Sequence, residues 1–454
     1  MKFRTENDSM GAVEIPSDAL YGAQTQRAIN NFSISNKPMP APFIRALLRV
    51  KQAAASANAE LELLAPKVAE TISAQVDRML ISEDLMQHFP VDRFQTGSGT
   101  SSNMNANEVL AHLVGAELGQ DISPNDELNL GQSSNDSIPS ALHISAAILL
   151  SDQLIPALNQ LSQTLKSRAD DLKEVTKTGR THLMDAMPVT FGQTLQAWAH
   201  QLDESVHQLK NLQPQLHQLA QGGTAVGTGI NAHPDFKALF CRHLSLNTGI
   251  HFSPAENPFA RIGSQDVAVA LSGALKTCAV AQMKIANDLR WMNSGPLAGL
   301  GEISLTALQP GSSIMPGKVN PVIPEAVAMA MAQVIGNDST ITIAGQSGNF
   351  ELNVMLPVIA CNLIDSLELL TESAKHLNDK AVADFTINHD VIEESLGRNP
   401  ILVTALNPVI GYMKAAEIAK KAYKEKRPVI DVAQEMTGIN RQTLEQLMNP
   451  TELT

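Results

Sequence analysis

The apolar positions in the middle of the chain recur with the period of an α-helix. From residue 191 they are spaced by three and four over about six turns, which is the spacing of one helical face. The members of this stripe are Phe191, Leu195, Trp198, Leu202, Val206, Leu209 and Leu212. Similar stripes run from Leu154 to Leu165 and from Leu271 to Met292, and helical stretches are also expected at about 321–336 and 352–377.

Long helices with apolar stripes are best buried against one another, so an all-α fold with a central long-helix bundle is expected. We place this bundle at residues 134–388. It follows an N-terminal domain of loops and shorter helices, residues 1–133, and precedes a small C-terminal helical domain, residues 389–454. In the N-terminal domain the expected helices are 43–62, 68–81 and 106–118.

Composition narrows the class of protein. Aromatic residues make up only 4% of the 454 residues, which favours helix over sheet. The formal net charge of −13 argues against a nucleic-acid partner, because neutralising phosphates needs clustered positive charge. The basic run from Lys414 to Arg427 is interpreted as a solvated helix face.

Cysteine usage and hydropathy bear on the compartment. The three cysteines are far apart and form no CxxC pair, which excludes a disulfide framework and fits a reducing compartment. No uncharged apolar run reaches 18 residues, and Glu6 and Asp8 stand where a signal peptide would be apolar. We therefore expect a cytoplasmic protein with no membrane partner.

Four polar stretches rich in Gly or Ser interrupt the helical pattern. They are 96–103, 131–136, 179–183 and 311–321. Three of them run directly into helices, so their backbone N–H groups and the helix dipole can converge on an anion. Each also has a plain structural reading: a lone glycine loop is often only a turn, and a lone His182 is more often structural than catalytic. Ser133 to Asn135 and Asn320-Pro321 are each typical of a helix start.

The stretch 311–321 is the hardest to explain by structure alone. It combines two adjacent serines, Lys318 and four helix breakers in a loop. Such a loop can present a nucleophile or base together with a cation, and its backbone N–H groups favour an ionised serine. The glycine-rich segment 222–229 lacks the ending of a phosphate-binding loop, so a helix-connecting loop is expected there.

The residues Gly311-Ser-Ser-Ile-Met-Pro-Gly-Lys-Val-Asn-Pro321 match the signature of the fumarase/aspartase superfamily. The resemblance extends, in the family's order, through 96–105, 133–136, 179–183 and 222–229, and it covers nearly the whole chain, from Gly22–Arg27 to Gly411-Tyr412. Within the superfamily the sequence resembles the class II, iron-independent fumarases. Aspartases typically carry other residues at His182 and Gly317, so these two positions favour the hydro-lyases.

The resemblance implies reversible trans addition of water to fumarate, giving L-malate, as in the tricarboxylic acid cycle. It implies Ser312 as the base that takes the C3 proton, His182 as the acid/base acting on water, and Glu325 as the orienter of His182. It also implies a homotetramer with active sites assembled from three subunits, and no metal or other cofactor. The implied substrate-binding residues are Ser98, Gly99, Thr100, Asn103, Ser133, Ser134, Asn135, Thr181, Ser313, Lys318, Val319 and Asn320.

Two departures from the family pattern stand out. A second dicarboxylate site is usually formed by His-Pro-Asn-Asp, which here reads Ser123, Pro124, Asn125 and Asp126. Serine cannot supply the positive charge of a histidine, so dicarboxylate binding there is doubtful. The second departure is Met184, where Gln is usual.

Two other functions remain open at this point. One is an ammonia-lyase of the same superfamily that acts on aspartate or a substituted aspartate. The other is a non-catalytic structural protein on the same scaffold, which loss of Ser312, His182, Lys318 or Asn320 would support; all four residues are present.

Overall fold

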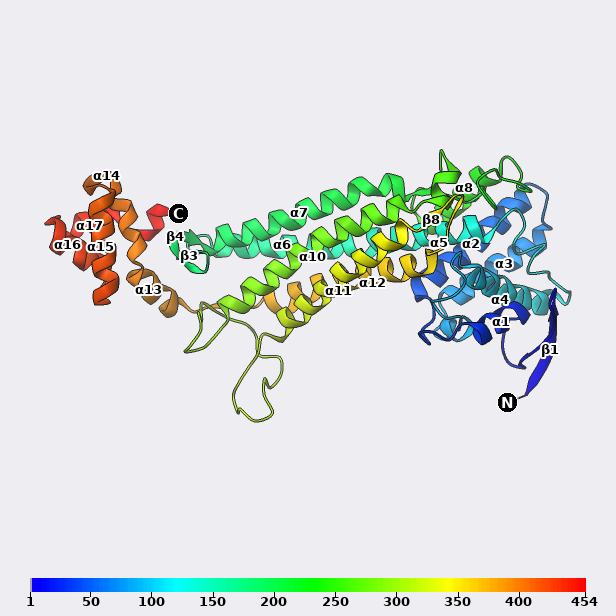
Figure 1. Ribbon diagram of the computed structural model, residues 1–454, viewed down its shortest axis with the longest axis horizontal. Helices are drawn as coiled ribbons and strands as arrows, with labels where there is room; N and C mark the ends of the chain where they lie inside the picture. Colours follow the sequence, from blue (N-terminus) through cyan, green and yellow to red (C-terminus); the bar gives the residue numbers. More distant parts are fainter. Residues whose placement is uncertain (1) are drawn as a thin grey trace. The chain divides into compact units, whose positions relative to one another are not determined.

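A computed structural model describes residues 2–454, which form two compact units. Unit 1 comprises the chain up to Pro156 together with His207–Ala279 and Ala332–Thr371. Unit 2 comprises Ala157–Val206, Val280–Met331 and Glu372–Thr454. Both units are mainly helical, as the sequence predicts (Figure 1). The predicted boundaries at 133/134 and 388/389 stay predictions.

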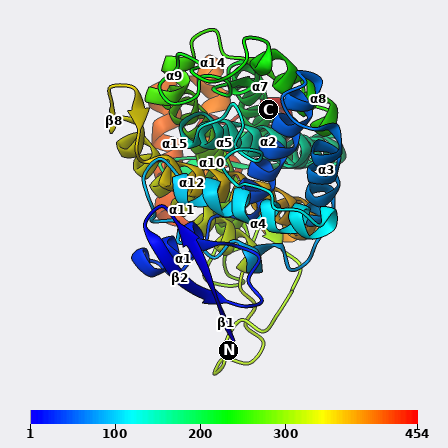
Figure 2. The same ribbon diagram turned by 90° about the vertical axis from the view of Figure 1, so that its right-hand side faces the viewer.

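Helix α2 (Ala41–Glu60) is central to unit 1. It packs against α3, α4, α5 and α8, and α2, α3 and α8 lie side by side in Figure 2. Small residues on α2, among them Ala53, Ala54 and Ala57, are fully buried and allow close approach of these helices. The elements wholly in unit 1 are β1 (Phe3–Asp8), β2 (Gly11–Pro16), α1 (Ala23–Asn31), α2, α3 (Pro66–Leu80), η1 (Leu85–His88), α4 (Thr100–Leu118), α5 (Ser134–Leu149), η2 (Leu150–Leu154), β5 (Gln218–Leu219), α8 (Phe236–Thr248), β6 (Ser253–Pro254), α9 (Pro258–Gly263), β8 (Gly348–Asn349) and β9 (Leu352–Asn353).

Unit 2 contains a β-hairpin and the C-terminal helices. The hairpin strands β3 and β4 pair antiparallel, and β3 packs against α13. A separate apolar core around Leu406, Ile418, Val432 and Leu444 holds the C-terminal helices together. The elements wholly in unit 2 are β3 (Thr176–Thr181), β4 (Met184–Thr190), β7 (Ile303–Ser304), η3 (Asn378–Val382), β10 (Thr386–Ile387), α13 (His389–Arg398), η4 (Pro400–Leu406), α14 (Asn407–Ile410), α15 (Tyr412–Glu425), α16 (Val429–Thr437), α17 (Arg441–Leu447) and η5 (Pro450–Leu453).

The longest helices contribute residues to both units. They are α6 (Ile155–Asp171), α7 (Phe191–Leu216), α10 (Asp266–Met292), α11 (Val322–Gly345) and α12 (Leu356–Leu377). Polar side-chain bonds between these helices set their register: in unit 1 Ser272 donates to Asp338 at 2.8 Å, and Asn337 donates to Asp365 at 2.8 Å. In unit 2 Lys166 donates to Asp203 at 2.6 Å.

The apolar stripes predicted from the sequence are buried, except for the half-buried Leu212 at the end of the α7 stripe. Leu195 and Leu202 on α7, and Leu271 and Leu289 on α10, have no exposed surface. The residues of the stripe that ends at Leu165 are also fully buried. The helical period of the sequence therefore identified the faces that form the core.

Some predicted helix bounds were wrong. Helix α4 begins at Thr100, not 106, because residues 100–105, which are polar except for Met104, lack the apolar period that the prediction used. Helix α11 continues through Gly336 to Gly345, since one helical glycine costs only about 1 kcal/mol. Helix α12 begins at Leu356 because Leu352 and Asn353 pair with β8.

The hairpin β3–β4 was missed altogether. Its strands carry no regular alternation of apolar and polar residues, and a register shift lies between Thr178 and Arg180. Gly179 sits in this shift, where an added Cβ would lie 2.4 Å from the Met187 carbonyl oxygen. The sequence of β3 therefore gave little indication of a strand, because the backbone requires a glycine at position 179 and glycine is uncommon within strands.

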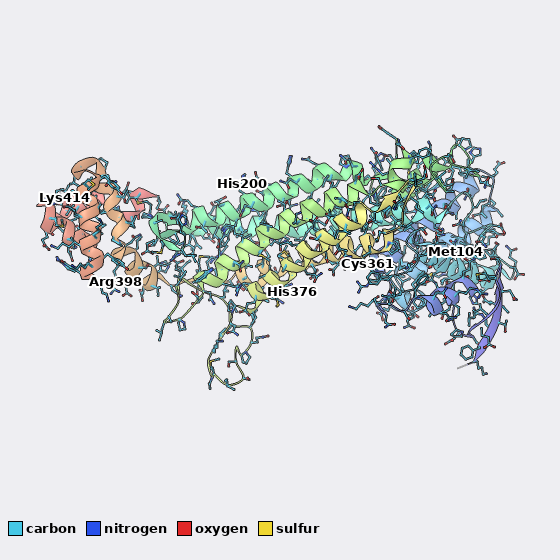
Figure 3. All side chains as sticks on the ribbon, in the orientation of Figure 1. Met104, His200, Cys361, His376, Arg398 and Lys414 are labelled. Atoms are coloured by element: carbon cyan, nitrogen blue, oxygen red, sulfur yellow. The ribbon has the colours of Figure 1, made fainter. Side chains whose placement is uncertain are left out.

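The cysteines are free and buried. Cys361, which lies on α12 in Figure 3, places its sulfur 3.8 Å from that of Met39. Burial raises the pKa of the Cys361 thiol to about 12, and that of Cys241 likewise to about 12. Their thiolates are thus scarce near neutral pH.

One helical stretch has the length and composition of a membrane span. It is Ser134–Asp171, and 72% of its most apolar window is buried inside the protein. Burial of this kind is typical of a core helix, and the same composition suits the interior of a helical bundle.

Candidate active site

In unit 1 the first two polar stretches meet at the N-termini of α4 and α5. Gly99 has a positive φ of 73°, and a Cβ there would lie 2.8 Å from Ile138 of α5. The hydroxyls of Ser98 and Thr100 are 2.8 Å apart and hydrogen bonded. The close approach that glycine permits therefore brings Ser98, Thr100 and the start of α5 together.

Ser133 is the N-cap of α5, as the structural reading of the sequence predicts. Its Oγ accepts the N–H of Asn135 at 3.2 Å, and its own N–H donates to Asp136 Oδ1 at 2.9 Å. Ser134 and Asn135 form the first turn, so backbone N–H groups and two polar side chains gather at a helix N-terminus. This arrangement suits a carboxylate ligand.

Asp136 connects this helix start to the segment 222–229, which is a loop as predicted. Its Oδ2 accepts the N–H groups of Gly222 and Thr224, each at 2.9 Å. Burial raises the pKa of Asp136 to about 6, although these hydrogen bonds act in the opposite direction. On the same side Asn135 Nδ2 donates to the Ala225 carbonyl at 2.8 Å.

The side-chain amide of Asn129 joins α4 to the segment before α5. Its Oδ1 accepts from Asn103 at 3.1 Å and from Asn107 at 3.2 Å, and its Nδ2 donates to the Gln132 carbonyl at 3.2 Å. Asn103 is 1% exposed, so it acts here as a buried support. Asn103 is thus tied to the residue just before Ser133.

In unit 2 the third polar stretch is the turn of the β3–β4 hairpin. Thr181 pairs with Met184, and the two residues between them, His182 and Leu183, have φ of 56° and 61°. Positive φ at both positions defines the tight turn that suits hairpins, but residues other than Gly, Asn and Asp rarely adopt it. His182 is therefore held at the exposed tip of the hairpin in a left-handed backbone conformation. Such conformations cluster at functional sites, which supports a functional role for His182.

The fourth stretch lies in the long connection between α10 and α11, which extends away from these helices in Figures 1 and 2. The loop closes on itself, since Gly311 N donates to the Lys318 carbonyl and Asn320 Nδ2 to the Gly311 carbonyl, both at 2.8 Å. Within it Ser312 Oγ accepts the N–H groups of Ile314 at 3.2 Å and Met315 at 3.0 Å. Two donors therefore point at this one hydroxyl.

A cavity of about 640 Å³ in unit 2 borders this loop. Lys318, Asn320 and Glu325 line it from the loop and the start of α11, and Arg290 and Trp291 line it from the end of α10. The cavity thus collects two cations, four side-chain amides and the Glu325 carboxylate beside the serine loop, a donor-rich set that suits an anionic ligand.

The three side chains predicted to carry the proton transfers do not contact one another through hydrogen bonds within the described residues. In residues 2–454 no hydrogen bond or ion pair links Glu325, His182 and Ser312 to one another. The roles of these side chains, and those of Ser313 and Val319, stay predictions. Within the same described range, no group of three or more His, Cys, Asp or Glu side chains could hold a metal ion.

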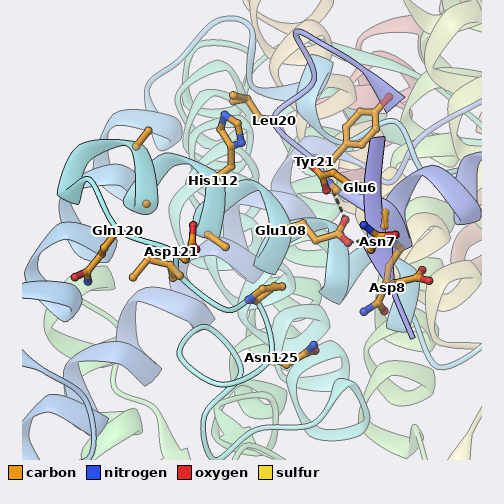
Figure 4. A pocket seen from close by; sticks show the side chains of 18 of the residues that line it. Glu6, Asn7, Asp8, Leu20, Tyr21, Glu108, His112, Gln120, Asp121 and Asn125 are labelled. Atoms are coloured by element: carbon orange, nitrogen blue, oxygen red, sulfur yellow. Dashed lines mark hydrogen bonds between the residues drawn. The ribbon is translucent and has the colours of Figure 1, made fainter. Parts of the chain in front are cut away.

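The doubtful dicarboxylate segment uses its polar groups internally. Ser123 Oγ accepts the N–H groups of Asn125 at 3.3 Å and Asp126 at 3.0 Å, and donates to Asp126 Oδ2 at 2.8 Å. Asn125 and Pro124 border a cavity of about 800 Å³ that is also lined by Glu6, Asp8, Glu108 and Asp121 (Figure 4). The surroundings are therefore acidic.

Several supporting residues were missed by the sequence analysis. Lys51 is 1% exposed within the apolar pattern of α2, and Glu302 is 2% exposed beside the β3–β4 hairpin. Lys51 follows Leu47 by four positions, so a lysine on the apolar face was visible in the sequence. For Glu302 no sequence signal existed, because its partners are about 120 residues away.

Comparisons with known proteins agree with this geometry. The family model described as Lyase matches residues 11–336, and the one described as Fumarase C C-terminus matches residues 402–454. A fumarate hydratase class II of Pseudomonas aeruginosa is 61% identical over 99% of this chain and 98% of that relative. Another, of Xylella fastidiosa, is 56% identical over 100% and 96%.

Solved structures give the same answer. The class II fumarase of Schistosoma mansoni matches with a TM-score of 0.95 and 37% identity, covering 100% of this chain and 99% of that one. The helical fold and its polar loops thus define a lyase of the fumarase/aspartase type. The chain belongs to the class II fumarate hydratase family. The sequence-based predictions of family, fold class and enzyme class are confirmed.

Proposed function

We propose that the chain catalyses the reversible trans addition of water to fumarate, giving L-malate. Dehydration of malate removes a weakly acidic C3 proton and leaves negative charge that spreads into the adjacent carboxylate. Donors aimed at that carboxylate stabilise the transition state more than the ground state. The site must therefore supply a base and a set of carboxylate donors.

Ser312 is the proposed base. The observation that carries this assignment is the pair of N–H groups, from Ile314 and Met315, that donate to its Oγ. Donors of this kind stabilise an alkoxide more than a neutral hydroxyl, so they lower the cost of ionising the serine. The exposed loop that holds Ser312 suits a segment that orders around the substrate.

The two substrate carboxylates are assigned to polar groups of both units. In unit 1 these are Ser98, Gly99, Thr100, Asn103, Ser133, Ser134 and Asn135, and in unit 2 Thr181, Ser313, Lys318, Val319 and Asn320. His182, at the tip of the hairpin, is assigned the proton transfer to and from water on the opposite face of the substrate, with Glu325 as its orienter.

Because the family resemblance implies shared sites, we infer a homotetramer in which each active site combines segments from three subunits. The proposed compartment is the cytoplasm, and the proposed role is the fumarate–malate step of the tricarboxylic acid cycle. Val280 and Trp291 on α10, and Met329 and Ile343 on α11, are exposed apolar side chains, which supports burial of these helices against another copy of the chain.

Absorbance of the fumarate double bond tests the proposed reaction. We expect a rise when the protein is mixed with L-malate and little change with L-aspartate at the same concentration. Release of fumarate from aspartate at a comparable or higher rate would identify an ammonia-lyase instead. No change with either substrate would favour a non-catalytic protein.

A further inference from the structure

Lys51 is a buried lysine that no part of the proposed proton transfer uses. It is 1% exposed on α2, and its Nζ donates to Gln132 Oε1 at 3.0 Å and to Asn129 Oδ1 at 3.2 Å. Both partners are neutral amides. Lysines are almost never fully buried unless they are paired with an opposite charge, so this position needs an explanation.

No carboxylate pairs with Lys51 in the described part of the chain. Among the charged side chains on the helices that pack against α2, only Asp136 acts electrostatically on it, and Asp136 is held by Ser133, Gly222 and Thr224. Many of the other charged groups near α2 are engaged elsewhere: Asp77 with Gln52, Glu108 with Thr25, Glu117 with Arg78, and Arg242 and His243 with Glu60. On α2 itself Arg45 and Arg49 donate to the carbonyls of Leu80 and Asn247, and His143 of α5 bonds to the Leu216 carbonyl. The remaining titratable side chains of the helices packed on α2, apart from the buried thiol of Cys241, are Lys67, Glu70, His112 and Lys237.

Lys51 also fixes the side chains that hold the segment before α5. Because its ammonium only donates, both amides must turn their oxygens toward it. Gln132 Nε2 is then free to donate to the Leu128 carbonyl at 3.1 Å, and Asn129 Nδ2 to the Gln132 carbonyl at 3.2 Å. The turn that leads into Ser133 therefore takes its shape from Lys51.

We propose that Lys51 is a positioning residue for the dicarboxylate, which both shapes the Asn129–Gln132 turn and supplies a buried positive charge that the bound dianion compensates. The proposal rests on the proposed function in one respect, namely that Ser133 to Asn135 hold a substrate carboxylate. Inside the protein this charge is screened little by salt, so it attracts a dianion more strongly than a surface lysine does.

Binding and protonation are then coupled. Burial lowers the pKa of Lys51 to about 7, against the weaker opposing effect of Asp136, so the free protein loses this charge above neutral pH. A dianion nearby favours the ammonium form, and by reciprocity the ammonium form binds the dianion more tightly. For a coupling of about tenfold, KM should rise roughly sixfold between pH 6.5 and 8.5.

The variants Lys51→Met and Lys51→Arg separate charge from packing. The rise in KM caused by Lys51→Met should be roughly sixfold larger at pH 6.5, where the wild-type lysine is charged, than at pH 8.5, where mainly the loss of its hydrogen bonds to the turn remains. Its kcat should change less than KM. Lys51→Arg should restore a low KM at both pH values, because its charge does not titrate. Lys166→Met, at a half-exposed lysine of unit 2, is the control and should leave the KM profile unchanged.

A wild-type measurement covers the case in which the variants fail to fold. Calorimetric titration with succinate, a dicarboxylate with no double bond, in two buffers of different ionisation enthalpy counts the protons taken up. A tenfold coupling predicts an uptake of roughly 0.4 proton per site at pH 8. An enzyme that turns over malate, with no proton uptake and the same KM change in Lys51→Met at both pH values, would overturn the proposed charge role of Lys51 and leave the proposed function intact. Absence of malate turnover in the wild type would instead remove the proposed function.

Discussion

Arg180 forms an ion pair with the buried carboxylate of Glu302 next to the turn that carries His182. Arg180 Nη1 lies 3.2 Å from Glu302 Oε2, and Lys177 Nζ lies 3.4 Å from the same oxygen. The backbone carbonyl of Glu302 accepts the Asn388 N–H at 3.0 Å. One carboxylate therefore fastens the β3–β4 hairpin to the connection that leads into the Ser312 loop.

Replacing Glu302 by Gln should destabilise the protein by about 3–5 kcal/mol, because the buried Lys177 and the partly buried Arg180 lose their counter-charge. The free energy of unfolding in urea measures this change. Glu372→Gln is the matched control, since Glu372 pairs with Lys375 on an exposed helix face and should contribute little. Equal small effects of the two substitutions would show that Lys177 and Arg180 are solvated well enough without Glu302.

His143 should make the protein sensitive to acid. Burial lowers the pKa of this histidine to about 4, while its Nδ1 lies 3.0 Å from the Leu216 carbonyl as a donor in the neutral form. Its unfolded pKa is near 6.5, so the unfolded chain binds the extra proton first. The stabilisation is complete above pH 6.5 and is lost as the pH falls toward 4, by about 3 kcal/mol at most.

The variant His143→Asn, which keeps a donor near Nδ1, isolates this effect. The drop in unfolding free energy between pH 7.5 and 5 should be smaller in the variant than in the wild type. Burial raises the pKa of Asp136, which opposes the effect of His143 in this range, but Asp136 is present in both proteins and cancels. Parallel pH profiles for the two proteins would contradict the assignment.

The Ser123 segment should not hold a dicarboxylate. Its N–H donors are already bonded to Ser123 Oγ, and Asp126 and the neighbouring Glu127 repel a dianion. Crystals of the wild type soaked in malate or citrate should show no dicarboxylate there, and Ser123→His should gain binding through its charge. Malate turnover should survive the substitution. An ordered dicarboxylate at Ser123 in the wild type would show that the charge argument is wrong.

Subunit mixing tests the proposed shared sites. If each site combines segments of different subunits, inactive Ser312→Ala and His182→Asn proteins should partly complement after refolding together. Mixed tetramers would then contain some sites with both Ser312 and His182. Measured fumarate absorbance should recover a fraction of wild-type activity, whereas each variant refolded alone serves as the control. No recovery in verified mixed tetramers would place both residues of a site on one chain.

The long helices could be predicted from the sequence, because burial of one helix face leaves apolar residues at a spacing of three and four that is specific to an α-helix. The candidate site loop 311–321 could also be predicted, because its serines, lysine and asparagine are contiguous in the sequence and match one family signature. The sequence did not reveal the hairpin that presents His182, since that hairpin depends on Gly179 admitting the Met187 carbonyl. Nor did it reveal the partners of Glu302 and Lys51, because these contacts join segments about 80 to 120 residues apart in the chain.

The rate of malate dehydration by Ser312→Ala tests the central claim most directly. With Ser312 as the base, kcat should fall by at least about a hundredfold while KM and the unfolding free energy change little. Ser313→Ala is the neighbouring control and should act mainly on KM, since Ser313 is assigned to binding. A fall in kcat of only about tenfold, roughly 1.4 kcal/mol of transition-state stabilisation, would mean that another group removes the C3 proton.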